Sequence, residues 1–239
     1  MPKEPLKGTK YLCENMSFSA QEAMKKLRTN TMIALPNNNS CKVIGLTSTQ
    51  PKEGKSFTTI NLAYTFAQMG KKVMLLDADI RRPTIVEKLK LQTSVGLGEL
   101  LTDNNDISQA IQHYTDSKGQ YGFDVIGGVR TYDNASELLL SNRFPAFLDT
   151  LRKAYDILLI DLPPVEAVTD AVIVGKQTDG VIIVVRENRI PRKQFDKCLR
   201  QLDYADINIL GVVFNGSVEG TGKKYSYGSY GSYGYNKYY

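Results

Sequence analysis

The chain has 239 residues, of which 42% are hydrophobic, and this suits one α/β domain or two small domains with a buried core. The formal net charge is +5, but residues 220–239 carry three lysines and no acid. The other residues hold 27 basic against 25 acidic side chains, and this near balance excludes a broad basic surface for nucleic acid. Three widely spaced cysteines form neither a disulfide framework nor a metal cluster, and no run of roughly 18 apolar residues suggests a membrane helix, so we expect a cytoplasmic protein with reduced thiols.

The first predicted element is a helix near the N-terminus. Residues 1–16 contain two prolines and are expected to form an extended leader. From 17 to about 35, side chains recur at helical spacing, and either of two serines suits the N-cap. The spaced residues are Ala20, Met24, Leu27 and Thr31, and the serines are Ser17 and Ser19. The sequence PNNNS then predicts a break in the chain.

The middle of the chain alternates between short apolar runs and helix-like stretches. The runs predict strands at 43–47, 72–76, 123–126, 157–160, 180–185 and 209–214. Helices are predicted at about 56–69, 106–114, 137–153, 167–176 and 191–203. Continuous apolar strands are buried on both faces, so we expect an α/β fold: a mostly parallel sheet with helices on both faces. A single domain is predicted to extend from 17 to 219.

A phosphate-binding loop follows the first predicted strand. The sequence STQPKEGKS, residues 48–56, lies between a strand and a helix, which is the context that a Walker A motif requires. Backbone N–H groups there can bind phosphates, Lys55 can neutralise the β- and γ-phosphates, and Ser56 can offer a hydroxyl to Mg²⁺. Thr49 stands where the common motif has its first glycine. The predicted nucleotide-binding residues are Gln50, Pro51, Lys52, Glu53, Gly54, Lys55, Ser56 and Phe57.

Three aspartates follow predicted strands. Asp77 and Asp79 end the second strand in VMLLDADIRRP, and Asp161 ends another in YDILLIDLPP. Carboxyl ends of parallel strands meet at one edge of the sheet, so these side chains are expected beside the phosphate loop. There they could bind the metal and accept a proton, or they could only cap the next helices. Arg81 or its neighbour Arg82 could stabilise the transferred group or anchor the loop. Asn215, at the end of the last strand, could read adenine or form a turn.

Seven of the fourteen tyrosines lie within the last fifteen residues. Serine, glycine and asparagine separate them, so residues 220–239 are predicted to be a flexible tail outside any core. Such a tail could be the substrate of a tyrosine kinase, or only a flexible linker or sticky end. The predicted phosphorylation sites are Tyr225, Tyr227, Tyr230, Tyr233, Tyr235, Tyr238 and Tyr239.

Taken together, these motifs resemble the bacterial tyrosine kinases of the CpsD/CapB type, which accompany capsule and exopolysaccharide export. The resemblance covers nearly the whole chain and includes PKEGKS, LLDADIRRP, LLIDLPP, NASELLLSNRF and the tyrosine-rich end. It implies a P-loop fold, ATP, Mg²⁺ and autophosphorylation in trans. It also implies Asp77 as the general base, with Ser56, Asp79 and Asp161 serving the metal. Lys52 departs from the family, which commonly has glycine there.

The resemblance also implies partners. Glu22, Lys25 and Arg28 match an early-helix pattern through which the family forms rings, although lysine stands where arginine is usual. A membrane-bound polysaccharide co-polymerase is expected to activate the kinase and recruit it to the inner face of the cell membrane, and other proteins are expected as tyrosine substrates.

Three other functions compete with this interpretation. Partitioning ATPases of the ParA/MinD type share the fold, but they carry a lysine where this chain has Gln50. A non-catalytic, nucleotide-binding scaffold could present a tail that another kinase phosphorylates. An RNA-binding tail is a weaker alternative, because three lysines provide little electrostatic attraction to a phosphate backbone.

Overall fold

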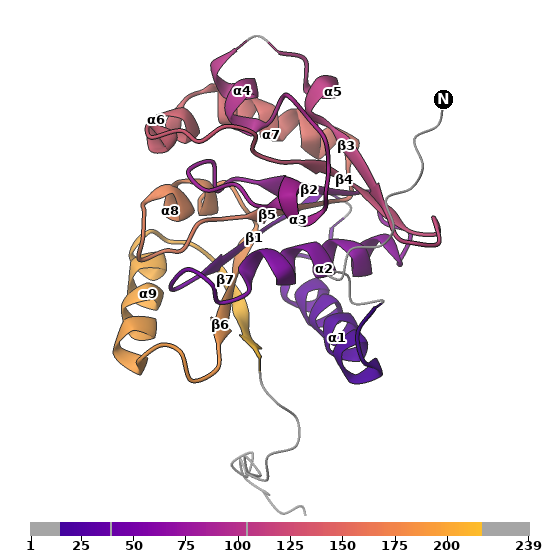
Figure 1. Cartoon of the computed structure of the whole chain (residues 1–239). Helices are drawn as coiled ribbons and strands as arrows, with labels where there is room; N and C mark the ends of the chain where they lie inside the picture. Colours follow the sequence, from indigo (N-terminus) through magenta and orange to yellow (C-terminus); the bar gives the residue numbers. More distant parts are fainter. Residues whose placement is uncertain (1–14, 39, 104, 217–239) are drawn as a thin grey trace, which may run out of the picture.

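A seven-stranded sheet forms the centre of the protein (Figure 1). The structure is a computed structural model and describes residues 15–38, 40–103 and 105–216. The strand order is β3-β4-β2-β5-β1-β6-β7; β3 pairs antiparallel with β4, and the other pairings are parallel. The strands are β1 (Lys42–Ser48), β2 (Val73–Asp77), β3 (Gln112–Thr115), β4 (Gly122–Ile126), β5 (Ile157–Asp161), β6 (Gly180–Arg186) and β7 (Ile209–Asn215). The predicted mostly parallel α/β fold is confirmed.

Helices cover both faces of the sheet (Figure 1). They are α1 (Phe18–Ala34), α2 (Lys55–Ala67), α3 (Ile85–Lys88), α4 (Leu97–Thr102), α5 (Ile107–Ala110), α6 (Ala135–Leu140), α7 (Arg143–Ala154), α8 (Asp170–Gly175) and α9 (Arg192–Tyr204). One core cluster joins the sheet to α1, α2 and α3, and the other joins it to the helices from α4 to α9 inclusive. In β1, Val43 belongs to one cluster and Ile44 to the other, because successive strand side chains point to opposite faces. The continuous apolar runs in the sequence therefore reflect burial on both sides.

The predicted first helix is present as α1. Ser17 is its N-cap, and its hydroxyl accepts a hydrogen bond from the Ala20 N–H at 3.4 Å. Met24 and Leu27 pack against the core cluster on the α2 side, and Thr31 is buried. Among the described residues, no helix has both the length and the apolar character needed to cross a bilayer. Residues 1–14 of the predicted leader and 217–239, including the tyrosine tail, lie outside the described part.

Several predicted helix boundaries were wrong. The helix predicted over 106–114 ends at Ala110 as α5, and the chain then forms β3. Tyr114 of β3 is buried against Phe123 of β4, with ring centroids 5.3 Å apart, so cross-strand packing overrides local helix propensity. The helix predicted over 137–153 is divided between α6 and α7, and α8 is shorter than the predicted 167–176. The short helices α3 and α4 were not predicted.

Candidate active site

The P-loop connects β1 to α2 and contains two left-handed backbone torsions. Lys52 has a φ of 67°, and Gly54, the N-cap of α2, has a φ of 96°. The first N–H groups of a helix have no partner within the helix, so a sharp turn leading into α2 leaves donors for phosphate oxygens. The strand–loop–helix arrangement predicted for the motif is therefore present.

Two side chains hold the loop against the sheet. The buried carboxylate of Glu53 accepts hydrogen bonds from the N–H of Gln50 at 2.8 Å and from the N–H of Arg186, at the end of β6, at 3.3 Å. Asn215, the last residue of β7, donates from Nδ2 to the Glu53 carbonyl at 2.9 Å. The contacts of Glu53 with Arg186 and with Asn215 were not anticipated from the sequence, because they join residues far apart in the chain. Adenine recognition by Asn215 stays a prediction.

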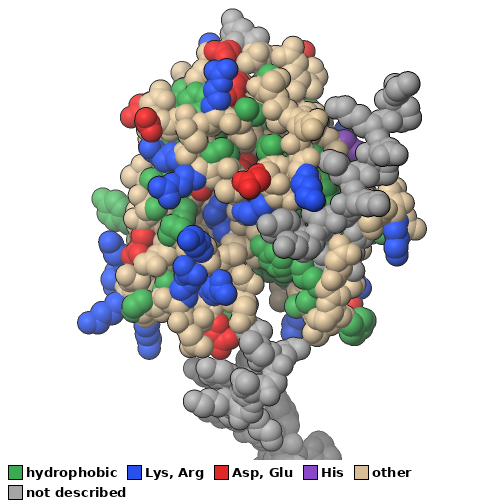
Figure 2. All heavy atoms as spheres, viewed as in Figure 1, with side chains coloured by type: hydrophobic (Ala, Val, Ile, Leu, Met, Phe, Trp, Pro, Cys, Tyr) green, Lys and Arg blue, Asp and Glu red, His purple; other side chains and the backbone are tan. Residues whose placement is uncertain are grey.

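A cavity of about 700 Å³ lies beside this loop. Most of the predicted nucleotide-binding residues line it: Pro51, Lys52, Gly54, Lys55, Ser56 and Phe57. The Gln50 side chain instead donates to Gln194 Oε1 of α9 at 2.9 Å, and Glu53 is fully buried. On this face, Lys and Arg side chains gather over the P-loop and near α3 (Figure 2), a charge distribution suited to a polyphosphate.

The three predicted aspartates meet at the edge of the sheet beside the loop. Asp77 and Asp161 are register partners at the ends of β2 and β5. The Lys55 ammonium lies 2.9 Å from Asp161 Oδ1 and 4.0 Å from Asp79 Oδ2. Burial alone would lower the pKa of Lys55, but the neighbouring carboxylates, Asp161 first, raise it above its usual value. Lys55 is therefore a permanent cation at the mouth of the P-loop.

The three carboxylates differ in their access to the cavity. Asp77 is fully buried: Oδ1 accepts from the Asp79 N–H at 3.2 Å, and Oδ2 accepts from the N–H groups of Thr84 at 2.9 Å and Ile85 at 3.0 Å. Burial, followed by the negative charge of Asp161, raises the pKa of Asp77 to about 7. Asp79 lines the cavity, and burial raises its pKa as well, although Lys55 opposes the shift. A pKa near 7 favours Asp77 as the general base, whereas direct contact with the cavity favours Asp79.

The residues present fit a nucleotide with Mg²⁺. Asp161 Oδ2 is buried and has no hydrogen-bond partner among the described residues, although Oδ1 also receives the Thr59 hydroxyl at 3.1 Å. Ser56 and Asp79 line the cavity with further oxygen atoms, which are the ligands that Mg²⁺ prefers. Within the described residues, no group of three or more His, Cys, Asp or Glu side chains could hold a metal ion by itself. Water and phosphate oxygens would have to complete the coordination.

Arg81 anchors its own loop. Its Nε donates to Asp170 Oδ2 and its Nη1 to the Asp133 carbonyl, both at 2.7 Å, and Nη2 donates to Ser136 Oγ at 3.0 Å. These contacts match the anchoring alternative, and a catalytic role for Arg81 stays a prediction. Arg82 is exposed and lines the cavity. Thr84 and Lys88, which also line it, were missed because no motif in the sequence marks them.

The chain is similar in sequence and in fold to known proteins. A family model described as "AAA domain" matches residues 41–203. "Tyrosine-protein kinase YwqD" of Bacillus subtilis (strain 168) is 35% identical over 211 residues, which are 88% of this chain and 86% of that protein.

The chain belongs to the bacterial tyrosine kinase family. "Tyrosine-protein kinase etk" of Escherichia coli (strain K12) is 33% identical over 214 residues, but the chain spans only 29% of its length. The solved "kinase domain of Escherichia coli tyrosine kinase ETK" superposes with a TM-score of 0.84 at 32% identity, covering 95% of this chain and 87% of that one. A MinD structure from Pyrococcus horikoshii, with a TM-score of 0.62 and 21% identity, shares the fold alone.

The family's predicted ring-forming residues differ in their surroundings. Glu22 and Lys25 form an exposed ion pair at 2.7 Å, whereas Arg28 donates from Nη1 to the Thr65 carbonyl of α2 at 2.9 Å. The Arg28 Nε is buried without a partner among the described residues. Arg28 therefore packs on α2 of its own chain, whereas the Glu22 and Lys25 side chains are partly exposed to solvent. Their role as oligomer contacts stays a prediction.

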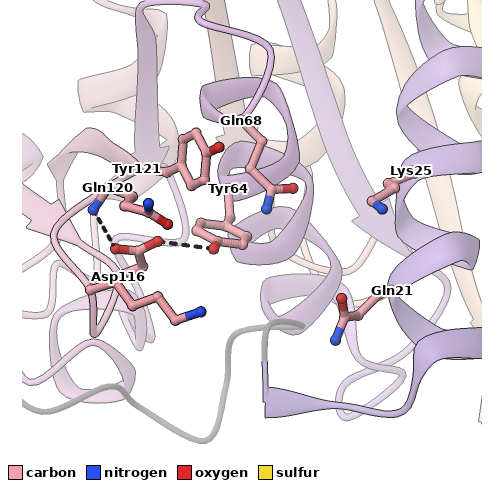
Figure 3. Close-up of a pocket in the computed structure, with 8 residues that line it drawn as sticks. Gln21, Lys25, Tyr64, Gln68, Asp116, Gln120 and Tyr121 are labelled. Carbon is pink, nitrogen blue, oxygen red and sulfur yellow. Dashed lines mark hydrogen bonds between the residues drawn. The ribbon is translucent and has the colours of Figure 1, made fainter.

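A second, smaller cavity lies next to Lys25. It has a volume of about 290 Å³ and lies between α1, the end of α2 and the turn that joins β3 to β4. Figure 3 shows Lys25 and Gln21 extending from α1 toward α2, where the Tyr64 hydroxyl donates to the buried Asp116 carboxylate at 3.1 Å. The cavity is separate from the P-loop site, and none of the residues that we predicted for catalysis or nucleotide binding lines it.

Proposed function

We propose that this chain is an ATP- and Mg²⁺-dependent protein-tyrosine kinase that phosphorylates its own C-terminal tyrosine cluster in trans. The observation that carries this proposal is the meeting of Lys55, Asp79 and Asp161 beside the P-loop cavity. Phosphoryl transfer depends mainly on positioning and on charge neutralisation, which this arrangement supplies. The proposed acceptors, Tyr225 through Tyr239 of the tail, lie outside the described residues.

Each side chain would have a separate task. Lys55 would neutralise negative charge on the β- and γ-phosphates, and Ser56, Asp79 and Asp161 would hold the metal directly or through water. Bound Mg²⁺ would supply further neutralisation of phosphate charge. The acceptor proton would pass to Asp77, whose raised pKa suits proton transfer near neutral pH, or to Asp79, which lines the cavity.

The walls of the cavity support an aromatic acceptor. Besides the charged groups, its lining includes an apolar set after β5: Pro163, Pro164, Ala167 and Val168. A phenol ring can pack on such a surface, and its ring places the hydroxyl farther from the backbone than a serine side chain would. This wall therefore supports tyrosine rather than serine as the acceptor.

The proposal extends to partners and place of action. Autophosphorylation in trans requires that two copies of the chain meet, and we propose that they do so in a ring-shaped homo-oligomer with contacts at Glu22 and Lys25. A membrane-bound polysaccharide co-polymerase would activate the kinase and recruit it to the inner face of the membrane, and the kinase would regulate capsular or extracellular polysaccharide synthesis. Some relatives carry related names, such as "Putative tyrosine-protein kinase in cps region" of Klebsiella pneumoniae. Other tyrosine-containing proteins would be additional substrates.

The alternative of a ParA/MinD-type ATPase has less support from the site. Gln50, which stands where those proteins have a lysine, has its uncharged amide hydrogen-bonded to Gln194 of α9. It therefore supplies no second cation from the start of the loop. A non-catalytic scaffold would not need Lys55 and three carboxylates to converge at the P-loop.

The test is incubation of the full chain with γ-labelled ATP and Mg²⁺, with and without an activator segment. Wild type is compared with Lys55→Met, a truncation after Gly222, and the control Lys153→Met, which removes an exposed lysine on α7. We expect label on tyrosine in wild type and control, and none in the other two. Released phosphate without protein label would favour the ATPase, and tail label that persists in purified Lys55→Met would favour the scaffold.

A further inference from the structure

Lys88 is a half-buried cation in the P-loop cavity that no motif marks. It is the last residue of α3 and lines the cavity together with Lys55 and Ser56. Its ammonium donates to Thr84 Oγ1 at 2.6 Å, and Thr84 Oγ1 lies 3.4 Å from Ser56 Oγ. Lys88 therefore approaches the P-loop serine from α3, whereas Lys55 belongs to α2.

The charge of Lys88 lacks a close partner within the protein. Among the described residues, no carboxylate oxygen lies within 4.0 Å of its ammonium, whereas Lys55 has an ion pair at 2.9 Å. Burial lowers the pKa of Lys88, and the more distant Asp161 and Asp77 oppose this shift only in part. A desolvated cation without a counter-ion is unfavourable unless an anion binds beside it. Arg82, by comparison, is exposed and remains solvated.

We propose that Lys88 is a second phosphate-binding lysine, which contacts oxygens of the γ-phosphoryl group before and during its transfer. This deepens the proposed kinase function and rests on it. Lys55 and Ser56 are the first residues of α2, whose N-terminal N–H groups suit the β-phosphate, and Lys88 lies near Ser56 through Thr84, on the side of α3. Lys88 therefore adds positive charge where the terminal phosphate extends beyond the loop.

In the transfer step, the bond between the γ-phosphorus and the β,γ-bridging oxygen breaks, and a bond to the tyrosine oxygen forms. The bridging oxygen keeps the electron pair and leaves with ADP, while the tyrosine proton passes to an aspartate. Lys88 gains and loses no proton. It stabilises negative charge on the transferred group, as cationic side chains do in other phosphoryl-transfer sites.

The test measures binding, independently of catalysis. Full-length wild type and variants are titrated with the Mg²⁺ complexes of ADP and of a non-hydrolysable β,γ-imido ATP analogue. For Lys88→Gln, we expect affinity for the triphosphate to fall by about tenfold or more, because a charge-assisted hydrogen bond is lost, with ADP affinity within about twofold of wild type. Lys88→Arg should retain most of the affinity. The control Lys90→Gln removes an exposed charge two residues away and should bind both nucleotides as wild type does.

An equal loss of affinity for both nucleotides, or no loss for either, would overturn the proposal. Thermal unfolding checks that Lys88→Gln is folded; Lys88→Met provides the same test without a buried polar amide if the glutamine variant folds poorly. A wild-type chain that binds the triphosphate through Lys88 but never labels tyrosine would refute the kinase function while leaving the phosphate contact established.

Discussion

Replacing Gly54 by alanine would disturb the P-loop at two points. Its φ of 96° disfavours any residue with a Cβ, and an added Cβ would lie 1.8 Å from Asn215 Nδ2 and 2.9 Å from Asn215 Cγ. The Asn215 amide would have to move away, which breaks its hydrogen bond to the Glu53 carbonyl. The substitution therefore combines backbone strain with the loss of the contact between β7 and the loop.

The expected effect on stability can be derived from these two points. The left-handed backbone costs about 1–2 kcal/mol for a residue with a Cβ, and the lost hydrogen bond about 1 kcal/mol. The lower conformational freedom of alanine in the unfolded chain offsets about 0.5–1 kcal/mol. We therefore expect the free energy of unfolding to fall by about 2 kcal/mol.

Urea denaturation of four variants separates the two contributions. Gly70→Ala is the control for backbone strain, because Gly70 has a φ of 73° and no atom within 4 Å of an added Cβ. Gly54→Ala should cost about 1 kcal/mol more than Gly70→Ala, and this excess should disappear in the Asn215→Ala background. If Gly54→Ala costs the same with and without Asn215, the clash does not control the loop and the reasoning is wrong.

Three further predictions concern other parts of the domain. Lys52→Gly should raise the free energy of unfolding by up to about 1 kcal/mol, because relief of the left-handed torsion outweighs the entropy of glycine; a lower urea midpoint would contradict this. Arg81→Met should destabilise the chain by roughly 2–4 kcal/mol, since it leaves the fully buried Asp170 carboxylate without its ion pair; adding Asp170→Asn should recover part of the loss in thermal unfolding. Once Cys13 is replaced by serine, Cys41 and Cys198 should react with iodoacetamide at pH 8 about a hundredfold more slowly than an ordinary thiol. The reason is that burial raises the pKa of each thiol to about 11. Their reaction should accelerate up to about that pH, and rapid labelling of the folded protein at pH 8 would refute the shifts.

Local patterns in the sequence were enough to locate the P-loop and the carboxylates beside it. The P-loop lies between an apolar strand and a helix, and Asp77 and Asp161 each end an apolar strand. In a parallel sheet such strands share one edge, so their convergence follows from topology alone. The register pairing of Asp77 with Asp161 and the contact of Lys55 with Asp161 agree with that inference. The α/β class followed in the same way from the alternation of apolar runs and helix-like stretches.

Local patterns failed where distant residues compete for the same segment. The stretch at 106–114 looks helical in isolation, yet Tyr114 is buried against Phe123 as part of β3, the edge strand beside β4. The boundary between α6 and α7 was missed for a similar reason, because each helix packs separately against the core. Helix length and strand pairing at the periphery depend on which surfaces are available for burial, and a local pattern does not contain that information.

The sequence by itself determined the fold class, the P-loop and the edge at which the carboxylates meet, because motif spacing and strand ends are local properties of the chain. Only the tertiary structure decided that Asn215 and Glu53 hold the loop, that Arg81 anchors on Asp170, and that Lys88 lines the cavity together with Lys55. Each of these depends on a contact between residues far apart in the chain, or on how deeply a side chain is buried. The packing of the whole domain determines those contacts and that burial.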